Sequence, residues 1–298
     1  MWKPVLQAMC KLRAAPVWLW MIGVACIVVP GAAPAAERPH RIVSINACTD
    51  QLLFKLADRE QIAALTHYAA DPDFSAYAGE VKASGIPLIR GNAEEVLHLK
   101  PDLIIAGKWT RTATRALLTA RGLPIADFAP DESVAASIVA IEEIARLVGH
   151  EDRGAAMIAE IEAALATAAA EPAASGPISV LEVQRRGYTS GRETLTGELL
   201  RRLGLVNAAD QLGIANVGHV TLEALLKARP DALIVMQPGA DASDQGVALL
   251  RHPALMAAYP SERRILLPAQ LTACGGPALA QAVRILGEGV RRVPRSGE

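Results

Sequence analysis

The sequence has few aromatic residues and no excess of basic charge. Phe, Tyr and Trp make up 4% of its 298 residues, and 30 Lys and Arg stand against 31 Asp and Glu. Nucleic-acid binding rests on basic residues that neutralise phosphates, so this balance gives it no support. The chain is rich in Ala, Leu and Val instead, a composition that is typical of a helix-rich α/β protein.

Motifs that mark common catalytic sites are also missing. The sequence contains no G-x-S-x-G, G-x-G-x-x-G, Walker loop or H-E-x-x-H pattern. The run Tyr188-Thr189-Ser190-Gly191 carries hydroxyl groups, but no obvious His and Asp partner accompanies it. We therefore expect a protein that is not an enzyme.

Long apolar runs are confined to the N-terminus. Three basic residues precede the apolar run Val17 to Val29, and Ala33-Pro34-Ala35 follows as a small-residue cleavage site. The run is shorter than the roughly 20 residues of a spanning helix, so an uncleaved anchor is the weaker interpretation. Cys26 is a poorly fitting lipidation site. We expect a signal peptide over residues 1–35 and an exported protein with a formal net charge of −4.

Cysteine is scarce as well. Cys10 and Cys26 leave with the signal peptide, so Cys48 and Cys274 remain. One pair in an oxidising compartment is a candidate disulfide. Two free buried thiols and a metal-ligating pair are the alternatives.

One local pattern occurs twice. Glu94 stands seven residues before Pro101-Asp102, and Glu223 stands seven residues before Pro230-Asp231; each Pro-Asp opens a short apolar run. The pattern predicts an amphipathic helix, a proline stop and a buried strand. Chance is the alternative, because Pro-Asp is common before strands. We favour two similar α/β lobes with a cleft between them, where small ligands usually bind.

The rest of the pattern agrees with two lobes. Strands and helices alternate in each half, which favours parallel sheets. The first strand, Arg41 to Ile45, precedes a helix that begins at Thr49, a plausible N-cap. From Ser133 to Ala170 the chain is almost purely helical, with a break near Gly149. Its second part is long enough to bridge two lobes rigidly.

Together these features resemble the periplasmic cobalamin and ferric-siderophore binding proteins, the helix-linked substrate-binding proteins of ABC importers. The resemblance covers essentially all of the mature chain. Its carriers are Arg41-Ile42-Val43-Ser44, Glu94 with Lys100-Pro101-Asp102-Leu103-Ile104, Tyr188-Thr189-Ser190-Gly191, and Glu223 with Arg229-Pro230-Asp231. It implies Rossmann-like lobes at residues 40–150 and 177–298, joined by a single long helix at 151–171.

The resemblance also implies a partner. In the family, one exposed Glu on each lobe pairs with arginines of the membrane permease, and Glu94 and Glu223 occupy the matching places. Two separated carboxylates on a rigid body would give a charge-steered, two-point dock. The alternative is that each is an ordinary acid in the first turn of a helix. We expect a periplasmic monomer that docks through both.

Ligands of such proteins lie between the carboxyl ends of the two sets of strands. Tyr68 and Trp109 match aromatic positions of the cobalamin binders, although this chain has only one tryptophan after the signal peptide. Loop packing is the alternative role for both. Basic residues, among them Arg185 and Arg192, stand where tryptophans are expected and suit anionic chelates. The candidate ligand-binding residues are Asn46, Tyr68, Arg90, Lys108, Trp109, Arg186, Tyr188 and Thr272.

The identity of the ligand stays open at this point. A corrinoid is slightly favoured, and a ferric siderophore or haem is the alternative. His67 is a weak candidate for an axial metal ligand, since a histidine in a loop is more often a surface residue. No intrinsic cofactor is expected. An exported enzyme that acts on a metal chelate is a remote alternative.

Cys48 follows the first strand of the first lobe, and Cys274 follows the last strand of the second. A bond between them would join the two lobes across the cleft, provided that their Cα atoms lie within about 7 Å.

Overall fold

The computed structural model describes residues 38–107, 109–130, 132–169, 176–237, 246 and 248–294. The predicted signal peptide lies outside these residues, as does Lys108. Among the described residues, no helix is both long enough and apolar enough to cross a membrane.

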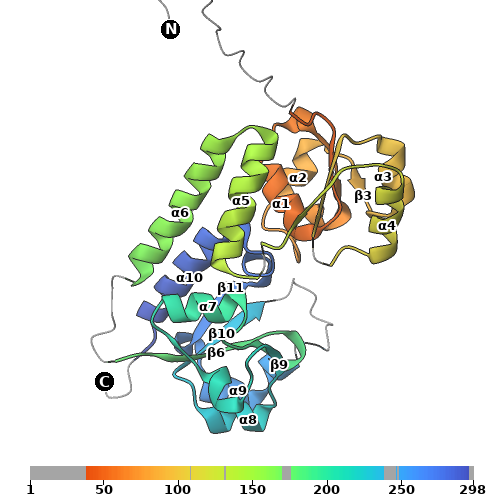
Figure 1. Cartoon of the computed structure of the whole chain (residues 1–298). Coiled ribbons are helices and arrows are strands. Elements are labelled where there is room, and N and C mark those ends of the chain that lie inside the picture. The colour runs from red at the N-terminus through yellow and green to blue at the C-terminus, as the bar shows by residue number, and fades with distance from the viewer. Residues whose placement is uncertain are drawn as a thin grey trace, which may run out of the picture. The chain divides into compact units, whose positions relative to one another are not determined.

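The first lobe is a parallel sheet with helices on its faces (Figure 1). Its strands lie in the order β3-β2-β1-β4-β5, and every neighbouring pair is parallel. The strands are β1 (Ile42–Ser44), β2 (Ile62–Thr66), β3 (Leu88–Ile89), β4 (Leu103–Gly107) and β5 (Ile125–Phe128). The helices are α1 (Ala47–Leu56), α2 (Ala78–Ser84), α3 (Ala93–Leu99) and α4 (Thr112–Ala120).

The second lobe repeats this plan with one strand fewer. Its parallel sheet has the order β11-β10-β6-β8, and a separate antiparallel ribbon pairs β7 with β9. The strands are β6 (Ser179–Val183), β7 (Tyr188–Ser190), β8 (Val206–Asn207), β9 (Val217–His219), β10 (Ala232–Gln237) and β11 (Arg264–Pro268). The helices are α7 (Leu195–Arg202), α8 (Leu222–Ala228), α9 (Pro253–Ala258) and α10 (Leu279–Arg291).

The two copies of the sequence repeat have the same local structure. Helices α3 and α8 end at Lys100 and Arg229, which both adopt the left-handed conformation, at φ 49° and 47°. The carboxylate of Asp102 then accepts hydrogen bonds from the backbone N–H of Arg41, and Asp231 accepts one from Ser179. Each aspartate thereby fastens the central strand of its sheet beside the strand that it opens. The repeat is a structural unit that both lobes use.

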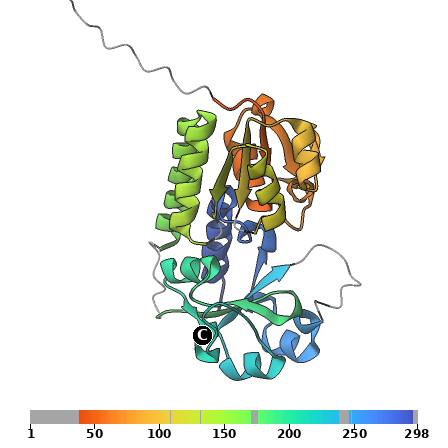
Figure 2. The same cartoon turned by 45° about the vertical axis from the view of Figure 1, so that its right-hand side comes forward.

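One long helix, α6 (Glu151–Ala169), connects the lobes. It packs against α5 (Val134–Val148) of the first lobe and against α10 of the second (Figures 1 and 2). A Cβ on Gly154 would lie 2.6 Å from that of Ala145, so α5 and α6 approach more closely than a larger residue would allow. At 1.5 Å per residue, α6 is about 28 Å long.

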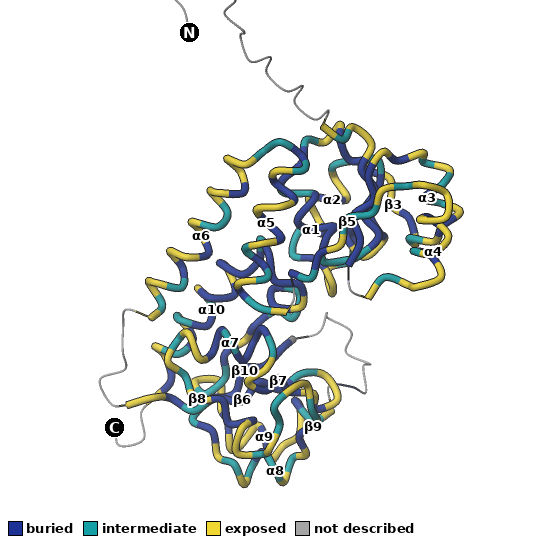
Figure 3. The backbone as a smooth tube through the Cα atoms, in the orientation of Figure 1, coloured by how far each residue is buried: buried dark blue, intermediate teal, exposed yellow. Residues whose placement is uncertain are grey.

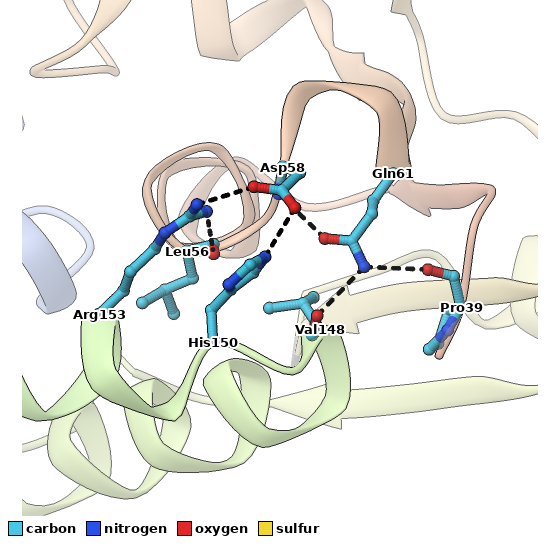
Figure 4. Close-up of polar contacts among 7 residues, drawn as sticks. All are labelled: Pro39, Leu56, Asp58, Gln61, Val148, His150 and Arg153. Carbon is cyan, nitrogen blue, oxygen red and sulfur yellow. Dashed lines mark hydrogen bonds and ion pairs between the residues drawn. The ribbon is translucent and has the colours of Figure 1, made fainter. Parts of the chain in front are cut away.

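Polar contacts hold the start of α6 on the first lobe (Figure 4). The Asp58 carboxylate accepts from Arg153 Nη2 at 2.7 Å and from His150 Nε2 at 2.9 Å. Gln61 Nε2 donates to the carbonyl of Val148 at 3.1 Å. The hydrogen bond from Arg153 is the main reason that the pKa of Asp58 lies below its usual value. These contacts fix the start of α6 to the first lobe.

The apolar core runs across the boundary between the lobes. One cluster of buried residues joins Ile42 and Leu53 of the first lobe to Ile161 of α6 and to Leu199 and Leu279 of the second. Figure 3 shows this buried interior between α1, α5 and α10. Two lobes that share one core resist being pulled apart, because separation would expose apolar surface to water.

Candidate functional site

The residues predicted to bind a ligand follow strands of the two parallel sheets. Asn46 comes after β1, His67 and Tyr68 after β2, and Trp109 after β4. Carboxyl ends of parallel strands lie at one edge of a sheet, so these residues share the edge where α/β proteins bind ligands. In the second lobe, Arg186 and Tyr188 follow β6, and Thr272 follows β11.

A disulfide shows that these two edges lie against each other. Cys48, in the first turn of α1, is bonded to Cys274, and their Cα atoms are 4.8 Å apart. The predicted bond is therefore confirmed, and the alternatives of free thiols or a metal-ligating pair are set aside. A 3-10 turn at Gly276–Ala278 also packs on α1 next to the bond.

The first lobe presents a cluster of three rings at its edge. The ring of Tyr68 lies 4.0 Å from that of His67 and 5.0 Å from that of Phe74, centre to centre. Tyr68 is 39% exposed and Phe74 is 46% exposed. The rings are tilted against one another, and a partly exposed aromatic group of this kind can contact a flat ligand with little loss of side-chain entropy. Tyr68 and His67 are thus adjacent, as their sequence positions require.

The second lobe presents a matching pair of rings. Tyr188 and His219 face each other across the β7–β9 ribbon, with ring centres 4.7 Å apart in an edge-to-face arrangement. Both residues are exposed, and Tyr188 is 44% exposed. Sequence reasoning included Tyr188 but missed His219 and Phe74. The pairing of residues 188 and 219 depends on a ribbon between distant segments, for which the sequence offers only a weak alternation.

Several predicted ligand residues have a structural role. Thr49 was the predicted N-cap of the first helix, but Asn46 caps it: its side-chain oxygen accepts from the N–H of Cys48 at 2.9 Å and of Thr49 at 3.3 Å. A Cβ on Gly107 would lie 2.4 Å from Asn46 Cγ, so the carboxamide packs directly against the end of β4. Thr272 is buried, with its hydroxyl 4.0 Å from Met236 Sδ. A ligand contact by Asn46 or Thr272 stays a prediction.

The basic residues at the edge differ in their surroundings. Arg192 is engaged by Asp210 at 3.3 Å and by Glu193 at 3.7 Å. Arg90 and Arg186 are exposed, and Arg186 adopts a left-handed conformation at φ 60°. Trp109 is 76% exposed. Arg90 and Arg186 therefore remain the better placed candidates for contact with an anionic group.

Two buried carboxyl groups lie behind this edge. Asp50, in the first turn of α1, is fully buried, and burial raises its pKa to about 7. Glu182 on β6 is equally buried, and its Oε2 has no hydrogen-bond partner among the described residues. Burial raises the pKa of Glu182 as well. A carboxyl group without a cationic partner in such a place favours its neutral form.

The two predicted docking glutamates occupy equivalent positions. Glu94 and Glu223 are each the second residue of their helix, α3 and α8, and both are exposed. Hydrogen bonds from its own backbone N–H and from Thr221 lower the pKa of Glu223. The helices belong to different lobes (Figure 1), so the two carboxylates mark separate points of the surface.

Direct coordination of a bare metal ion has no obvious site in the described part of the chain. It contains no group of three or more His, Cys, Asp or Glu that could hold a metal ion. His67 therefore belongs to no such group, and the ring beside it is that of Tyr68.

Comparisons with known proteins agree with this geometry. The family model for periplasmic binding proteins matches residues 42–271. A cobalamin-binding protein of Halobacterium salinarum is 27% identical over 221 residues, which are 73% of this chain and 59% of that protein. This match therefore spans less than two thirds of the relative.

Solved structures share the fold over nearly their whole length. The periplasmic haem-binding protein RhuT of Roseiflexus sp. RS-1 is 27% identical, with a TM-score of 0.70 over 86% of this chain and 99% of that one. The periplasmic vitamin B12 binding protein BtuF of Vibrio cholerae is 18% identical, with a TM-score of 0.65 over 87% of this chain and 99% of that one. The chain thus belongs to the periplasmic binding protein family, with the two-lobed, helix-linked fold of its cobalamin- and haem-binding members.

Proposed function

We propose that this protein is the substrate-binding protein of an ABC importer and carries a metal-containing tetrapyrrole. The observation behind the proposal is the pair of ring clusters, Tyr68 with His67 and Phe74 in one lobe and Tyr188 with His219 in the other. Both clusters follow the carboxyl ends of strands, and the Cys48–Cys274 bond draws those two edges together.

A flat macrocycle fits such a site better than a compact ion does. Rings in both lobes can contact the two faces or the rim of a tetrapyrrole, while exposed Arg90 and Arg186 can meet its carboxylate or phosphate groups. A corrinoid is our first candidate, and the cobalamin-binding relative supports it. Haem is the second, because a phenol or an imidazole at this edge could ligate its iron.

The chelate is cargo rather than a resident cofactor, and binding involves no chemical change. The protein functions in the periplasm as a monomer after removal of residues 1–35. Its lobes comprise residues 40–150 and 177–298 on either side of the connecting helix 151–171. Glu94 and Glu223 dock it to arginines of the permease.

A spectroscopic titration tests the proposed cargo. The purified mature protein is titrated with cyanocobalamin, haem and a panel of ferric siderophores. We expect a one-to-one, submicromolar complex with a tetrapyrrole and recovery of the ligand unchanged. Tight binding of a siderophore alone, or of none of these ligands, would contradict the proposal.

Matched variants locate the site. Tyr68→Phe and Tyr188→Phe remove one hydroxyl from each ring cluster, and Tyr259→Phe removes one from a buried ring in the second lobe's core. If Tyr68 ligates haem iron, Tyr68→Phe shifts the Soret band and weakens binding at least tenfold, whereas Tyr259→Phe changes neither. If a corrinoid is the cargo, both edge variants lower the affinity only severalfold, through lost polar contacts.

A further inference from the structure

The segment that carries His67 and Tyr68 is tied to a buried acid on another element. Asp50 lies in the first turn of α1, and Thr66 is the last residue of β2, directly before the 3-10 turn His67–Ala70. The backbone N–H of Thr66 donates to Asp50 Oδ1 at 3.2 Å, and the Thr66 hydroxyl donates to Asp50 Oδ2. Both donors of Thr66 thus end on one carboxylate.

The same acid adjoins the anchor between the lobes. Asp50 is two residues from Cys48, whose disulfide reaches Cys274 in the second lobe. The neighbouring hydroxyls of Ser44 and Thr49 hydrogen-bond to each other at 2.8 Å, and both side chains are buried. Asp50 therefore connects the loop bearing Tyr68 to the rigid part of the molecule.

We propose that Asp50 is a positioning residue that holds the His67–Tyr68 segment for ligand binding, and that its ionisation makes the affinity for the ligand depend on pH. This inference rests on the proposed function, since it assigns regulation to the same ring cluster. A carboxylate accepts from both Thr66 donors in charge-assisted hydrogen bonds. A protonated carboxyl has its own O–H to place and holds Thr66 less firmly.

The direction of the effect follows from linkage. Burial raises the pKa of Asp50 to about 7, while its hydrogen bonds with Ser44 and Thr66 act in the opposite direction. The hydrogen bonds from Thr66 stabilise the ionised form of Asp50. By linkage, ionisation of Asp50 therefore strengthens those same hydrogen bonds. A ligand that needs the segment fixed therefore binds more tightly at pH 8 than at pH 6.

Other titratable groups near α1 lie on the surface or at its far end. Imidazole groups in general change charge in this pH range, so the exposed His67 requires a control. The elements β1, β2, β4 and the turn Gly276–Ala278, which pack on α1, contribute no titratable side chain. The other titratable or charged groups on α1 and the elements beside it are the Lys55–Glu80 pair with Tyr77, Tyr68, Arg153 at the end of α1, and exposed Glu142, Glu143 and Arg146.

The experiment measures ligand affinity between pH 6 and pH 8 for the full mature protein. Wild type should bind its tetrapyrrole threefold to tenfold more weakly at pH 6. Asp50→Asn, which keeps the shape of the side chain but cannot ionise, should give a flat profile close to the wild-type value at pH 6. Thr66→Val should flatten the profile in part. Asp71→Asn, a nearby carboxylate control, and His67→Gln should both keep the pH dependence.

A second measurement does not require the ligand. The amide resonances of Thr66 to Tyr68 in the unliganded protein should titrate near pH 7 in wild type and not in Asp50→Asn. Retention of the wild-type profile by Asp50→Asn, or a profile abolished by His67→Gln alone, would overturn the inference. Absence of tetrapyrrole binding with intact amide titration would refute the proposed cargo, and a missing titration would refute the role of Asp50.

Discussion

Two buried carboxyl groups, Asp50 and Glu182, set the molecule's response to pH at the scale of single residues. Neither has a cationic partner in the described structure, so burial dominates and the pKa of each is raised. Asp58 is the opposite case, because hydrogen bonds from Arg153 and His150 lower its pKa. Carboxyl groups in one protein thus act in opposite directions on stability.

Asp50 should make the folded state less stable as the pH rises. Its pKa is 3.8 when unperturbed and about 7 in the folded protein, so its contribution is complete below about pH 4 and is lost up to about pH 7. Asp50→Asn has no charge to bury. In urea unfolding from pH 4.5 to 8, the stability of wild type relative to this variant should fall by about 3 kcal/mol, at roughly 1.4 kcal/mol per pKa unit.

Parallel pH profiles for the two proteins would contradict this expectation. A free energy of unfolding that falls more steeply with rising pH in wild type than in Asp50→Asn supports it, whichever protein is the more stable overall.

Sequence patterns could not separate these acids from surface ones. Asp50 is preceded by Thr49 and looks like a favourable acid in a helix's first turn. Only the packing of β2 and the second lobe against α1 removes it from water. The N-cap of α1 is a similar case. Asn and Thr are both good N-caps, and the structure uses Asn46, whose side chain also packs against Gly107 of the distant strand β4, rather than Thr49.

At the scale of elements, the repeated helix–Pro-Asp–strand unit is defined by its backbone. Lys100 and Arg229 are left-handed residues at the helix ends, where glycine is the usual occupant. A residue with a Cβ is strained there by about 1 kcal/mol. The proline that follows each of them cannot continue the helix.

Glycine at either helix end should stabilise the protein. We expect Lys100→Gly and Arg229→Gly each to raise the free energy of unfolding by up to about 1 kcal/mol, with similar values because the two units are alike. Lys227→Gly, inside α8, is the control and should lower it by about 1 kcal/mol. Thermal unfolding measures all three, and a loss of stability in either left-handed position would contradict the assignment.

The sequence predicted most elements because their periodicity is local. The long helices and the strands after Pro-Asp were identified from spacing alone, and the structure contains them. The β7–β9 ribbon was missed, because its two short strands are stabilised by pairing with each other across the intervening helix and turn.

At the largest scale, contacts between the two lobes hold the lobes together. These are the shared apolar core, the Cys48–Cys274 bond, and a hydrogen bond of 2.9 Å from the N–H of Val134 to Glu198. Together with α6 they favour a site that is largely formed before the ligand arrives. Such a site loses little free energy to ordering when it binds.

Removal of the disulfide should destabilise the folded protein. The bond closes a loop of 226 residues, and disulfides typically contribute about 2–5 kcal/mol by restricting the unfolded chain. We expect the double variant Cys48→Ser with Cys274→Ser to unfold at a lower temperature and to bind its ligand more weakly, because the lobes lose their link at the site. Alkylation of the unreduced wild type should modify neither cysteine. An unchanged unfolding temperature would contradict the prediction.

Transport should depend on the two glutamates together. If the proposed docking is right, Glu94→Arg combined with Glu223→Arg should abolish uptake of the ligand by cells and leave its affinity intact, since like charges would then meet at both docking points. Glu142→Arg combined with Glu288→Arg makes the same change of charge on exposed parts of α5 and α10, and should transport normally. Normal uptake by the first pair would refute the docking role.

The sequence by itself determined the two lobes, their parallel sheets, the long connecting helix and the pair of cysteines. Each of these follows from local spacing, or from the small number of candidates in the chain. Tertiary structure alone decided which side chains lie together at the candidate site: Phe74 packs on Tyr68, His219 pairs with Tyr188, Asn46 became a cap, and Asp50 became a buried acid that binds Thr66. These outcomes depend on burial and on contacts between segments far apart in the chain, which local patterns do not encode.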